Sequence, residues 1–311
     1  MNEYSGKNII FIGGPPRSGT TLLQNILDSH SQIYGGPEFD MIPEIVAMRD
    51  RFHRAIDNRR IHLFFNKADL DRRFCKFVEN LLLPKAKSEE CDYISEKTPS
   101  NILYFCQLMQ IFPSAKFLFV LRDPIAVVAS LCRVRQKYRS RNLKPPRYIR
   151  NVFASIDYIR ACIEAGFTAY KTNPERVMIV LYERLVRDPK RIVNDLCRHI
   201  GIPWDSAMLV PGKKRHQGEV TIDGIWYDKK SYYRNIDCTS LYRRSKTLTK
   251  REHYAVYCAF RSIREITESG YCREAPSLRT NDKLMYALTS QIWKIYRDFR
   301  RRIPIKLLVI D

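Results

Sequence analysis

Residues 8–38 read NIIFIGGPPRSGTTLLQNILDSHSQIYGGPE, and this stretch predicts how the chain folds. The apolar run Ile9–Ile12 is typical of a buried strand, and the glycines and prolines at 13–16 end it. Apolar residues then recur at helical spacing, at Leu22, Leu23, Ile26 and Leu27. A strand, a glycine-rich loop and a helix N-terminus form a phosphate site, because the N–H groups of the first helical turn point at the anion.

The loop nearly matches the nucleotide-binding pattern G-x-x-x-x-G-K-[ST]. Gly14, Gly19 and Thr21 fit the pattern, but Thr20 stands in place of the lysine. That lysine normally reaches the β- and γ-phosphates, and the next hydroxyl holds magnesium. The nearest cation here is Arg17, so the sequence predicts a terminal phosphate bound without metal. An ordinary strand-to-helix turn is the alternative.

The composition indicates a folded protein with anionic partners. A chain of 311 residues with 45% hydrophobic residues can bury a large core, as one α/β domain or two small ones. The formal net charge of +21 favours a nucleotide, an acidic polymer, nucleic acid or an anionic membrane surface, without choosing among them. The basic stretch 133–150 is compatible with nucleic acid but is no specific signal for it.

The cysteines and the apolar runs predict a cytoplasmic location. Nine cysteines are scattered without a C-x-x-C pair or a metal-like Cys/His cluster, which favours core thiols in a reducing compartment. No apolar run approaches the roughly 20 residues that span a bilayer. The N-terminal sequence MNEYSGKN lacks the cationic region and apolar core of a signal peptide.

Predicted strands and helices alternate along residues 8–205. After the first strand, strand-like runs follow at 33–34, 93–95, 116–121 and 177–182, with helical patterns between them. This alternation predicts an α/β fold: a P-loop-like, doubly wound, mainly parallel sheet flanked by helices, with a helical and loop-rich C-terminal part. We expect a single domain over 1–311, with its core at 8–205.

Two charged residues follow predicted strands and are candidates for a functional site. Glu38 lies on a constrained loop after the strand at 33–34, and Lys97 lies on a loop after the strand at 93–95. In a βαβ unit the ligand groups gather at the carboxyl ends of the strands, so both can reach a transferred group. The sequence leaves open that both are exposed surface charges.

Arg122 and Ser130 predict a pocket for a second phosphate. Arg122 follows the strand at 116–121, and Asp123-Pro124 begins a helix with a favourable N-cap. Ser130 lies about two turns into that helix, on a face that can look back toward Arg122. An arginine and a hydroxyl suit a phosphate. A basic surface residue beside an ordinary helical serine is the alternative.

The C-terminal part changes character. Residues 206–250 are basic and aromatic, and predict either a flexible surface segment or a lid over an anionic, planar ligand. Thr249 begins a helix that we expect to run through Glu265. A final apolar stripe, favoured to dock on the domain and otherwise peripheral to a membrane, comprises Leu284, Leu288, Ile292, Trp293, Tyr296 and Phe299. The sequence leaves a homodimer open.

In combination, these motifs resemble the sulfotransferases that use 3′-phosphoadenylyl sulfate (PAPS). The run Pro16–Leu22 resembles their 5′-phosphosulfate loop, and Arg122-Asp123-Pro124 with Ser130 resembles their 3′-phosphate motif. Tyr182-Glu183 and the run 201–205 are similar to their later landmarks. The resemblance covers about residues 8–205 in order.

The first 40 residues resemble the protein-tyrosine sulfotransferases most. The resemblance places Glu38 on their catalytic glutamate, Lys97 on the lysine that approaches the sulfuryl group, and Ser240 in a nucleotide-contact region. Pro37 and Asp40 depart from the family pattern, where a glutamate and an arginine stand. These departures leave the acceptor open.

The resemblance implies sulfuryl transfer from PAPS to a hydroxyl of a protein tyrosine or a glycan. Glu38 would act as general base, and Arg17 and Lys97 would face the charge on the transferred group. The donor would be bound, without metal, by Arg17, Ser18, Gly19, Thr20, Thr21, Arg122, Ser130, Tyr182 and Ser240. A P-loop kinase and a non-catalytic anion- or nucleic-acid-binding protein are the alternatives.

Overall fold

The computed structural model describes residues 5–214, 216, 224–226, 233–242, 247–277 and 279–302. The chain divides into two compact units, one formed by residues 1–122 and 161–244 and the other by residues 123–160 and 245–311. The single-domain organisation expected from the sequence stays a prediction.

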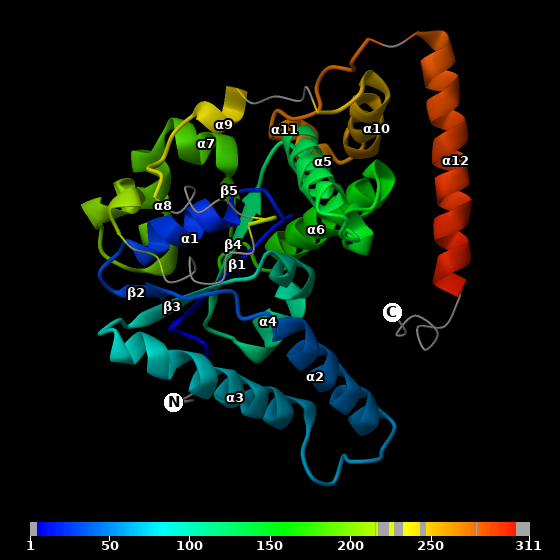
Figure 1. Ribbon diagram of the computed structural model, residues 1–311. Coiled ribbons are helices and arrows are strands. Elements are labelled where there is room, and N and C mark those ends of the chain that lie inside the picture. Colours follow the sequence, from blue (N-terminus) through cyan, green and yellow to red (C-terminus); the bar gives the residue numbers. More distant parts are fainter. Residues whose placement is uncertain are drawn as a thin grey trace. The chain divides into compact units, whose positions relative to one another are not determined.

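The first unit holds a five-stranded sheet in which every ladder is parallel (Figure 1). Its strands are β1 (Ile9–Gly13), β2 (Ile33–Gly35), β3 (Tyr93–Lys97), β4 (Lys116–Leu121) and β5 (Val177–Leu181), in the order β2-β3-β1-β4-β5. The strand order reverses direction next to β1, as it does in doubly wound sheets. The predicted fold class is confirmed.

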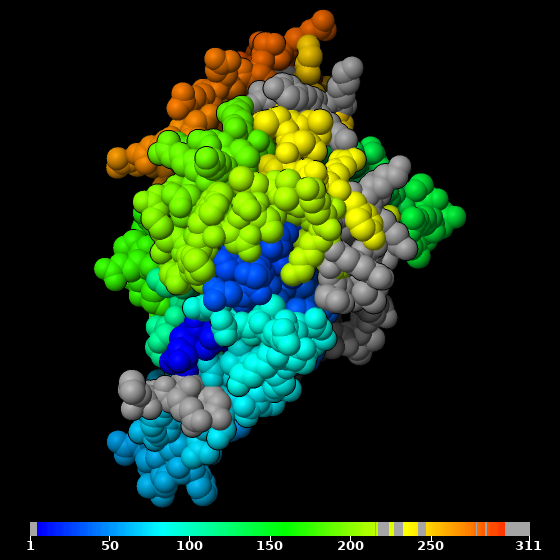
Figure 2. Space-filling model, turned by 90° about the vertical axis from the view of Figure 1, so that its left-hand side faces the viewer, coloured from blue at the N-terminus to red at the C-terminus, as the bar shows by residue number. Residues whose placement is uncertain are grey.

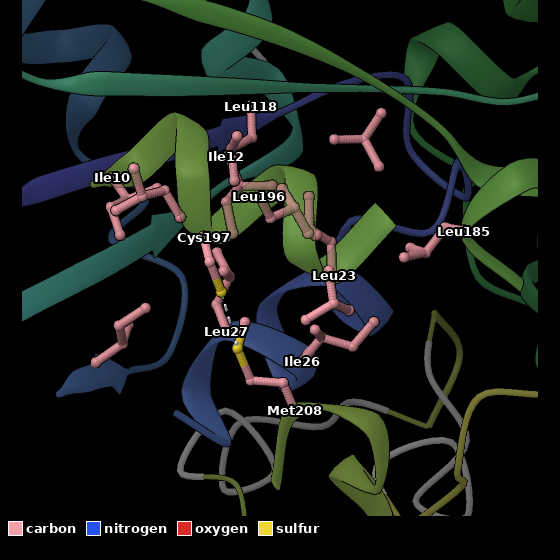
Figure 3. Close-up of a cluster of buried hydrophobic side chains, with 14 of the residues drawn as sticks. Ile10, Ile12, Leu23, Ile26, Leu27, Leu118, Leu185, Leu196, Cys197 and Met208 are labelled. Atoms are coloured by element: carbon pink, nitrogen blue, oxygen red, sulfur yellow. Dashed lines mark hydrogen bonds between the residues drawn. The ribbon is translucent and has the colours of Figure 1, made fainter. Parts of the chain in front are cut away.

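One face of the sheet packs against α1 (Thr20–Asp28) and α8 (Pro189–Ile200). Alternate strand residues point to this face, and in Figure 3 Ile10, Ile12 and Leu118 lie over the apolar sides of the two helices. A 3₁₀ turn, η3 (Ser206–Leu209), adds Met208, whose sulfur lies 3.7 Å from that of Cys197. This buried apolar layer fixes the position of α1 against the sheet, and with it the loop that joins β1 to α1.

The opposite face of the sheet is aromatic. Phe117 of β4 stacks on Phe11 with ring centroids 5.3 Å apart and meets the edge of Phe105 at 5.0 Å. Phe105 begins α4 (Phe105–Ile111), which follows the 3₁₀ turn η1 (Pro99–Tyr104). Phe119 meets Phe167 edge to face at 5.6 Å, and Phe167 lies on the part of α6 (Val152–Thr172) that belongs to this unit.

Of two long helices, α3 (Lys67–Ser88) packs against β3, and α2 (Ile42–Asp57) packs against α3 and η1. Buried Arg49 of α2 binds both carboxylate oxygens of Asp71 on α3, at 2.7 and 2.8 Å. The remaining elements of this unit are α7 (Tyr182–Arg187), η4 (Pro211–Lys213) and α9 (Thr239–Tyr242). In Figure 2 the blue segment after α1 reaches the surface between cyan α3 and the yellow-green segment that follows β5.

The second unit is helical. It contains α5 (Pro124–Ser140), η2 (Arg147–Ile149), the start of α6, α10 (Lys250–Phe260), α11 (Arg264–Glu268) and α12 (Thr280–Arg302). Thr249 caps α10 and forms a reciprocal capping box with Glu252. The single helix expected from Thr249 through Glu265 is wrong, because α10 ends at Phe260 and the backbone of Ile263 is extended. Phe260, Ile263 and Ile266 are all buried.

The apolar stripe of α12 is only partly covered. Trp293 stacks on Phe153 with centroids 6.1 Å apart and donates a 2.7 Å hydrogen bond to Asp157, which agrees with docking. Ile292 and Ile295 are 65% and 70% exposed. Among the residues that the structure describes, no helix combines the length and the apolarity needed to cross a membrane.

None of the nine cysteines, all of which the structure describes, forms a disulfide. Five are buried, and burial raises the pKa of the Cys75 and Cys272 thiols to about 12, which makes both poor nucleophiles. The cytoplasmic location stays a prediction.

Gly166 offers a test of the aromatic face. A Cβ at this position would lie 2.5 Å from the ring of Phe119. We expect Gly166→Ala to lower the free energy of unfolding by about 1–2 kcal/mol, because overpacking outweighs the gain of about 1 kcal/mol in helix propensity. Urea unfolding measures the change.

The Phe119→Leu background is the control. Once the ring is removed, Gly166→Ala should no longer destabilise the protein. The same loss in both backgrounds would contradict the packing of Phe119 on Gly166.

Candidate functional site

The loop between β1 and α1 is a tight turn that only glycine permits at two places. Gly19 has a φ of +107°, and a Cβ there would lie 2.3 Å from the ring of Tyr182. A Cβ at Gly14 would lie 2.5 Å from the carbonyl oxygen of Val120 on β4. The backbone of the loop therefore passes between β4 and the start of α7.

The N-terminus of α1 is left open toward an anion. Gly19 is the N-cap residue and provides no side-chain cap, so the first N–H groups of the helix lack the usual partner. The hydroxyl of Ser18 is completely buried beside them and has no hydrogen-bond partner among the described residues. Buried polar groups are rarely left unpaired, and those at functional sites commonly await a ligand. The donor set, one hydroxyl and several N–H groups, suits a phosphate or sulfate oxygen.

Arg17 holds a strained position in the same loop. Its φ of +73° is left-handed, which costs a non-glycine residue about 1–2 kcal/mol. The guanidinium donates to the carbonyl oxygen of Trp226, and the carbonyl oxygen of Arg17 accepts a 3.3 Å hydrogen bond from Arg122. Segments far apart in the sequence are thus tied to the loop through one residue.

Arg122, Tyr182 and Ser240 form one cluster. The Arg122 guanidinium lies over the Tyr182 ring, with its central carbon 4.2 Å from the ring centroid. It donates a 3.4 Å hydrogen bond to the carbonyl oxygen of Ser240, and the hydroxyls of Tyr182 and Ser240 are 2.6 Å apart. The Nε of Arg122 is buried without a partner in the described part of the chain. This Nε–H group can therefore donate to an anion.

Ser130 lies on α5 and is 8% exposed. Its helix begins as expected, since Asp123 accepts a hydrogen bond from the N–H of Ile125 and Pro124 occupies the first turn. Ser130 belongs to the second unit and Arg122 to the first, so their shared phosphate pocket stays a prediction.

Glu38 and Lys97 form an ion pair, although 59 residues separate them. The expectation that Lys97 lies on a loop is wrong: it is the last residue of β3, and only 2% of its side chain is exposed. The register pairs Lys97 with Ile12 of β1, which puts it next to the start of the phosphate loop. A buried ammonium group is stable only with a charged partner, and Glu38 supplies it.

Glu96 is a site residue that sequence reasoning missed. Its buried carboxylate accepts hydrogen bonds from the N–H of Phe39 at 3.2 Å, from Thr98 at 2.7 Å, and from Asn101. Phe39 directly follows Glu38, so Glu96 holds the loop that carries the candidate base. Burial raises the pKa of Glu96 from 4.5 to about 7. A strand glutamate beside Lys97 was the only signal, and it resembles any surface charge.

Two α1 residues, also missed, fix the loop from the other side. The buried amide of Gln24 donates to the carbonyl oxygens of Gly36, at 2.9 Å, and Ser95, at 3.3 Å. Asp28 accepts a 2.8 Å hydrogen bond from the N–H of Gly35 and also binds His216. The loop is therefore positioned by α1 and β3 together.

The described residues hold no group of three or more His, Cys, Asp or Glu side chains that could bind a metal ion. The charged groups at this edge of the sheet are instead arginine, lysine and carboxylate. Apart from Ser130, the structure brings the residues named from the sequence to the carboxyl ends of β1, β3, β4 and β5. Glu38 reaches this edge through its ion pair with Lys97, and Ser240 through its contacts with Arg122 and Tyr182. Their catalytic and binding roles stay predictions.

A family model described as "Sulfotransferase family" matches residues 9–206. The chain is 30% identical over 214 residues to protein-tyrosine sulfotransferase 1 of Danio rerio, which covers 65% of this chain and 55% of the relative. It is 31% identical over 212 residues to protein-tyrosine sulfotransferase 1 of Homo sapiens, which covers 65% of this chain and 53% of the relative. The chain thus spans about half the length of these curated relatives.

Two solved structures share the fold. The sulfotransferase domain from the Synechococcus PCC 7002 olefin synthase superposes with a TM-score of 0.51 at 19% identity, covering 93% of this chain and 96% of that one. The sulfotransferase domain from the curacin biosynthetic pathway gives a TM-score of 0.54 at 18% identity, covering 85% and 98%. Both have the same α/β architecture as this chain.

The buried carboxyl of Glu96 predicts a pH-dependent stability. Because its pKa is higher in the folded state, its contribution to stability is fully present below about pH 4.5 and is lost as the pH rises through about 7. We expect the unfolding free energy of the wild type, relative to Glu96→Gln, to fall by up to about 3 kcal/mol between about pH 5 and 8.

Urea unfolding at the two pH values measures this difference. The exposed Glu175→Gln is the matched control and should show no such change. An equal gap between wild type and Glu96→Gln at both pH values would rule out a raised pKa at Glu96.

Proposed function

Because the chain belongs to the sulfotransferase family, we propose that it transfers a sulfuryl group from PAPS to the hydroxyl of a protein tyrosine. One observation carries the proposal: the uncapped start of α1 and the buried Ser18 hydroxyl follow β1. The neighbouring strand, β3, ends in Lys97, which is paired with Glu38. An anion site and a candidate base thus share one edge of the sheet.

The donor-binding residues divide by the two ends of the nucleotide. Arg17 and the run 18–21 would hold the 5′-phosphosulfate through N–H groups, hydroxyls and one guanidinium. Arg122 and Ser130 would hold the 3′-phosphate, for which Arg122 has an unpartnered buried Nε. Tyr182, with Ser240 on its hydroxyl, would line the adenosine. PAPS has no triphosphate, which agrees with Thr20 in place of the P-loop lysine.

The reaction needs one base and compensating positive charge. PAPS supplies the sulfuryl group, whose bond to the 5′-phosphate oxygen breaks as the bond to the acceptor oxygen forms. Glu38 would take the proton of the acceptor hydroxyl. Lys97 and Arg17 would face the negative charge on the reacting oxygens, in positions fixed before the reaction by burial and by the bond to Trp226.

Two further facts support a protein tyrosine as the acceptor. The matched relatives are named protein-tyrosine sulfotransferases. The net charge of +21 favours an acidic peptide around the reacting hydroxyl over a neutral one. Sulfation of a glycan hydroxyl instead of a peptide would correct the acceptor and leave the donor unchanged.

Calorimetric titration with 3′,5′-ADP, the spent donor, tests the nucleotide site. We expect tight binding of 3′,5′-ADP and none of ATP with magnesium. Arg122→Ala should weaken the affinity about 10- to 100-fold, because a charge-assisted contact contributes roughly 1.5–3 kcal/mol. Arg187→Ala, an exposed arginine on α7, should leave the affinity unchanged.

Preference for ATP with magnesium would favour a kinase. Affinity for nucleic acid that survives Arg122→Ala, in a variant that no longer binds 3′,5′-ADP, would favour a non-catalytic binding protein.

Turnover tests the base. With PAPS and an acidic peptide that carries one tyrosine, Glu38→Gln should lower kcat by about 10²-fold or more and leave 3′,5′-ADP binding intact. Glu44→Gln, which changes an exposed glutamate on α2, should keep full activity. A peptide with phenylalanine in place of tyrosine should receive no sulfuryl group. Near-normal turnover of Glu38→Gln would remove this carboxylate from the mechanism.

A further inference from the structure

The second unit contains a cavity of about 290 Å³ between α5, the start of α6, α10 and α12. Small-molecule pockets usually measure about 300–1,000 Å³, so this cavity suits a ligand of roughly one ring and one polar group. Four arginines line it: Arg135, Arg139, Arg150 and Arg251. No residue of the candidate donor site is among its lining residues.

Arg135 is largely buried, and two of its donors are unused. Its side chain is 12% exposed, and Nε and Nη1 have no hydrogen-bond partner among the described residues. The third nitrogen, Nη2, lies 3.4 Å from the sulfur of Cys132 and 3.9 Å from a carboxylate oxygen of Glu252. A guanidinium that is removed from water and so weakly paired favours an anion beside it.

Glu252 is the one acidic residue among the described residues of the lining, and its Oε1 atom lies 3.9 Å from Arg135. Its Oε2 atom accepts hydrogen bonds from Thr249 in the capping box of α10. Arg251 is already paired with Asp282 at 2.6 Å. Neither Arg139 nor Arg150 forms an ion pair with a residue that the structure describes. The cavity therefore carries an excess of positive charge that the protein itself does not neutralise.

Aromatic and apolar side chains form another part of the lining. Phe153 stacks on Trp293, and Tyr286 meets Tyr254 edge to face with centroids 5.4 Å apart. Met285 and Ala255 also line the cavity. Burial raises the pKa of Tyr286 to about 12, so this phenol stays neutral and adds no negative charge. An aromatic ring fits such walls.

We propose that this cavity binds an oxyanion ester of an aromatic ring, with the anionic group on Arg135 and the ring against the apolar wall. The four arginines fit the oxygens of a phosphate or sulfate monoester, since a planar guanidinium binds two such oxygens at once. The start of α6 contributes Asn151 and Val152 to the lining, and its dipole adds to the attraction. This inference does not depend on the proposed function.

Calorimetry on the full chain, in saturating 3′,5′-ADP, tests the proposal. The probes are phenyl phosphate and phenyl sulfate, with inorganic phosphate and phenol as single-feature controls. We expect at least one ester to bind at one site, at least tenfold tighter than inorganic phosphate or phenol. Binding of phenyl phosphate, phenyl sulfate or both supports the site and names the group that it accepts.

Arg135→Met should weaken ester binding about tenfold or more, the effect of losing a charge-assisted contact. Lys137→Met is the matched control: it removes one positive charge from an exposed position on the same helix, outside the lining. Thr289→Trp, which narrows the cavity from an exposed lining position, should also weaken binding and needs no change in the core.

Thermal melting confirms that each variant is folded. No ester binding, equal affinity for inorganic phosphate, or equal losses in Arg135→Met and Lys137→Met would overturn the proposal, because attraction to a basic surface would then explain the data. Loss of 3′,5′-ADP binding alone would overturn the assignment of the nucleotide site and not this proposal. The test of the cavity is the affinity for the esters and its dependence on Arg135.

Discussion

The parallel pairing of β1 with β3 and β4 is the constraint on which the site depends. It sets Ile12 beside Lys97 and Gly13 beside Phe119, so β1 ends one residue beyond β3, and β4 continues two residues beyond the end of β1. The phosphate loop follows β1, Lys97 is the last residue of β3, and Arg122 directly follows β4. A 3.0 Å hydrogen bond from the N–H of Gly14 to the carbonyl oxygen of Pro99 joins two of the resulting loops. A shift of one residue in either ladder would turn these side chains to the other face of the sheet.

Around this edge the protein fixes its charges by burial. Lys97 and Glu96 are each 2% exposed, and isolated charges at that depth would be costly. Lys97 has Glu38, Glu96 has three donors, and Arg122 has the face of Tyr182. In contrast, the Ser18 hydroxyl and one Arg122 nitrogen are buried and left without partners in the described residues. The charged side chains are fixed by their partners, and the unpartnered hydrogen-bond donors are already in place. Such a site is pre-organised for an anion.

The features that were predicted correctly from the sequence are those that local residue chemistry determines. The order of strands and helices follows from periodicity and turn residues, and the start of α5 follows from Asp123 and Pro124. The sequence-based predictions were wrong or incomplete where tertiary contacts determine the position of a side chain. Whether Lys97 ends a strand or begins a loop depends on its pairing with Ile12, and Pro99 restricts only the residue before it. The role of Glu96 depends on a loop that folds across β3, which no spacing in the chain reveals.

The large net charge and the short contacts act at different ranges. The chain carries 54 lysines and arginines against 33 acidic residues, yet the candidate site contains three cations, Arg17, Lys97 and Arg122, and Lys97 is paired with Glu38. Beyond about 8 Å, physiological salt screens most of the remaining field. An excess of positive charge raises the rate at which anions arrive, and salt weakens this effect. Discrimination among anions must come from donors that are fixed and desolvated, such as the α1 N-terminus, because there each unmade hydrogen bond is costly.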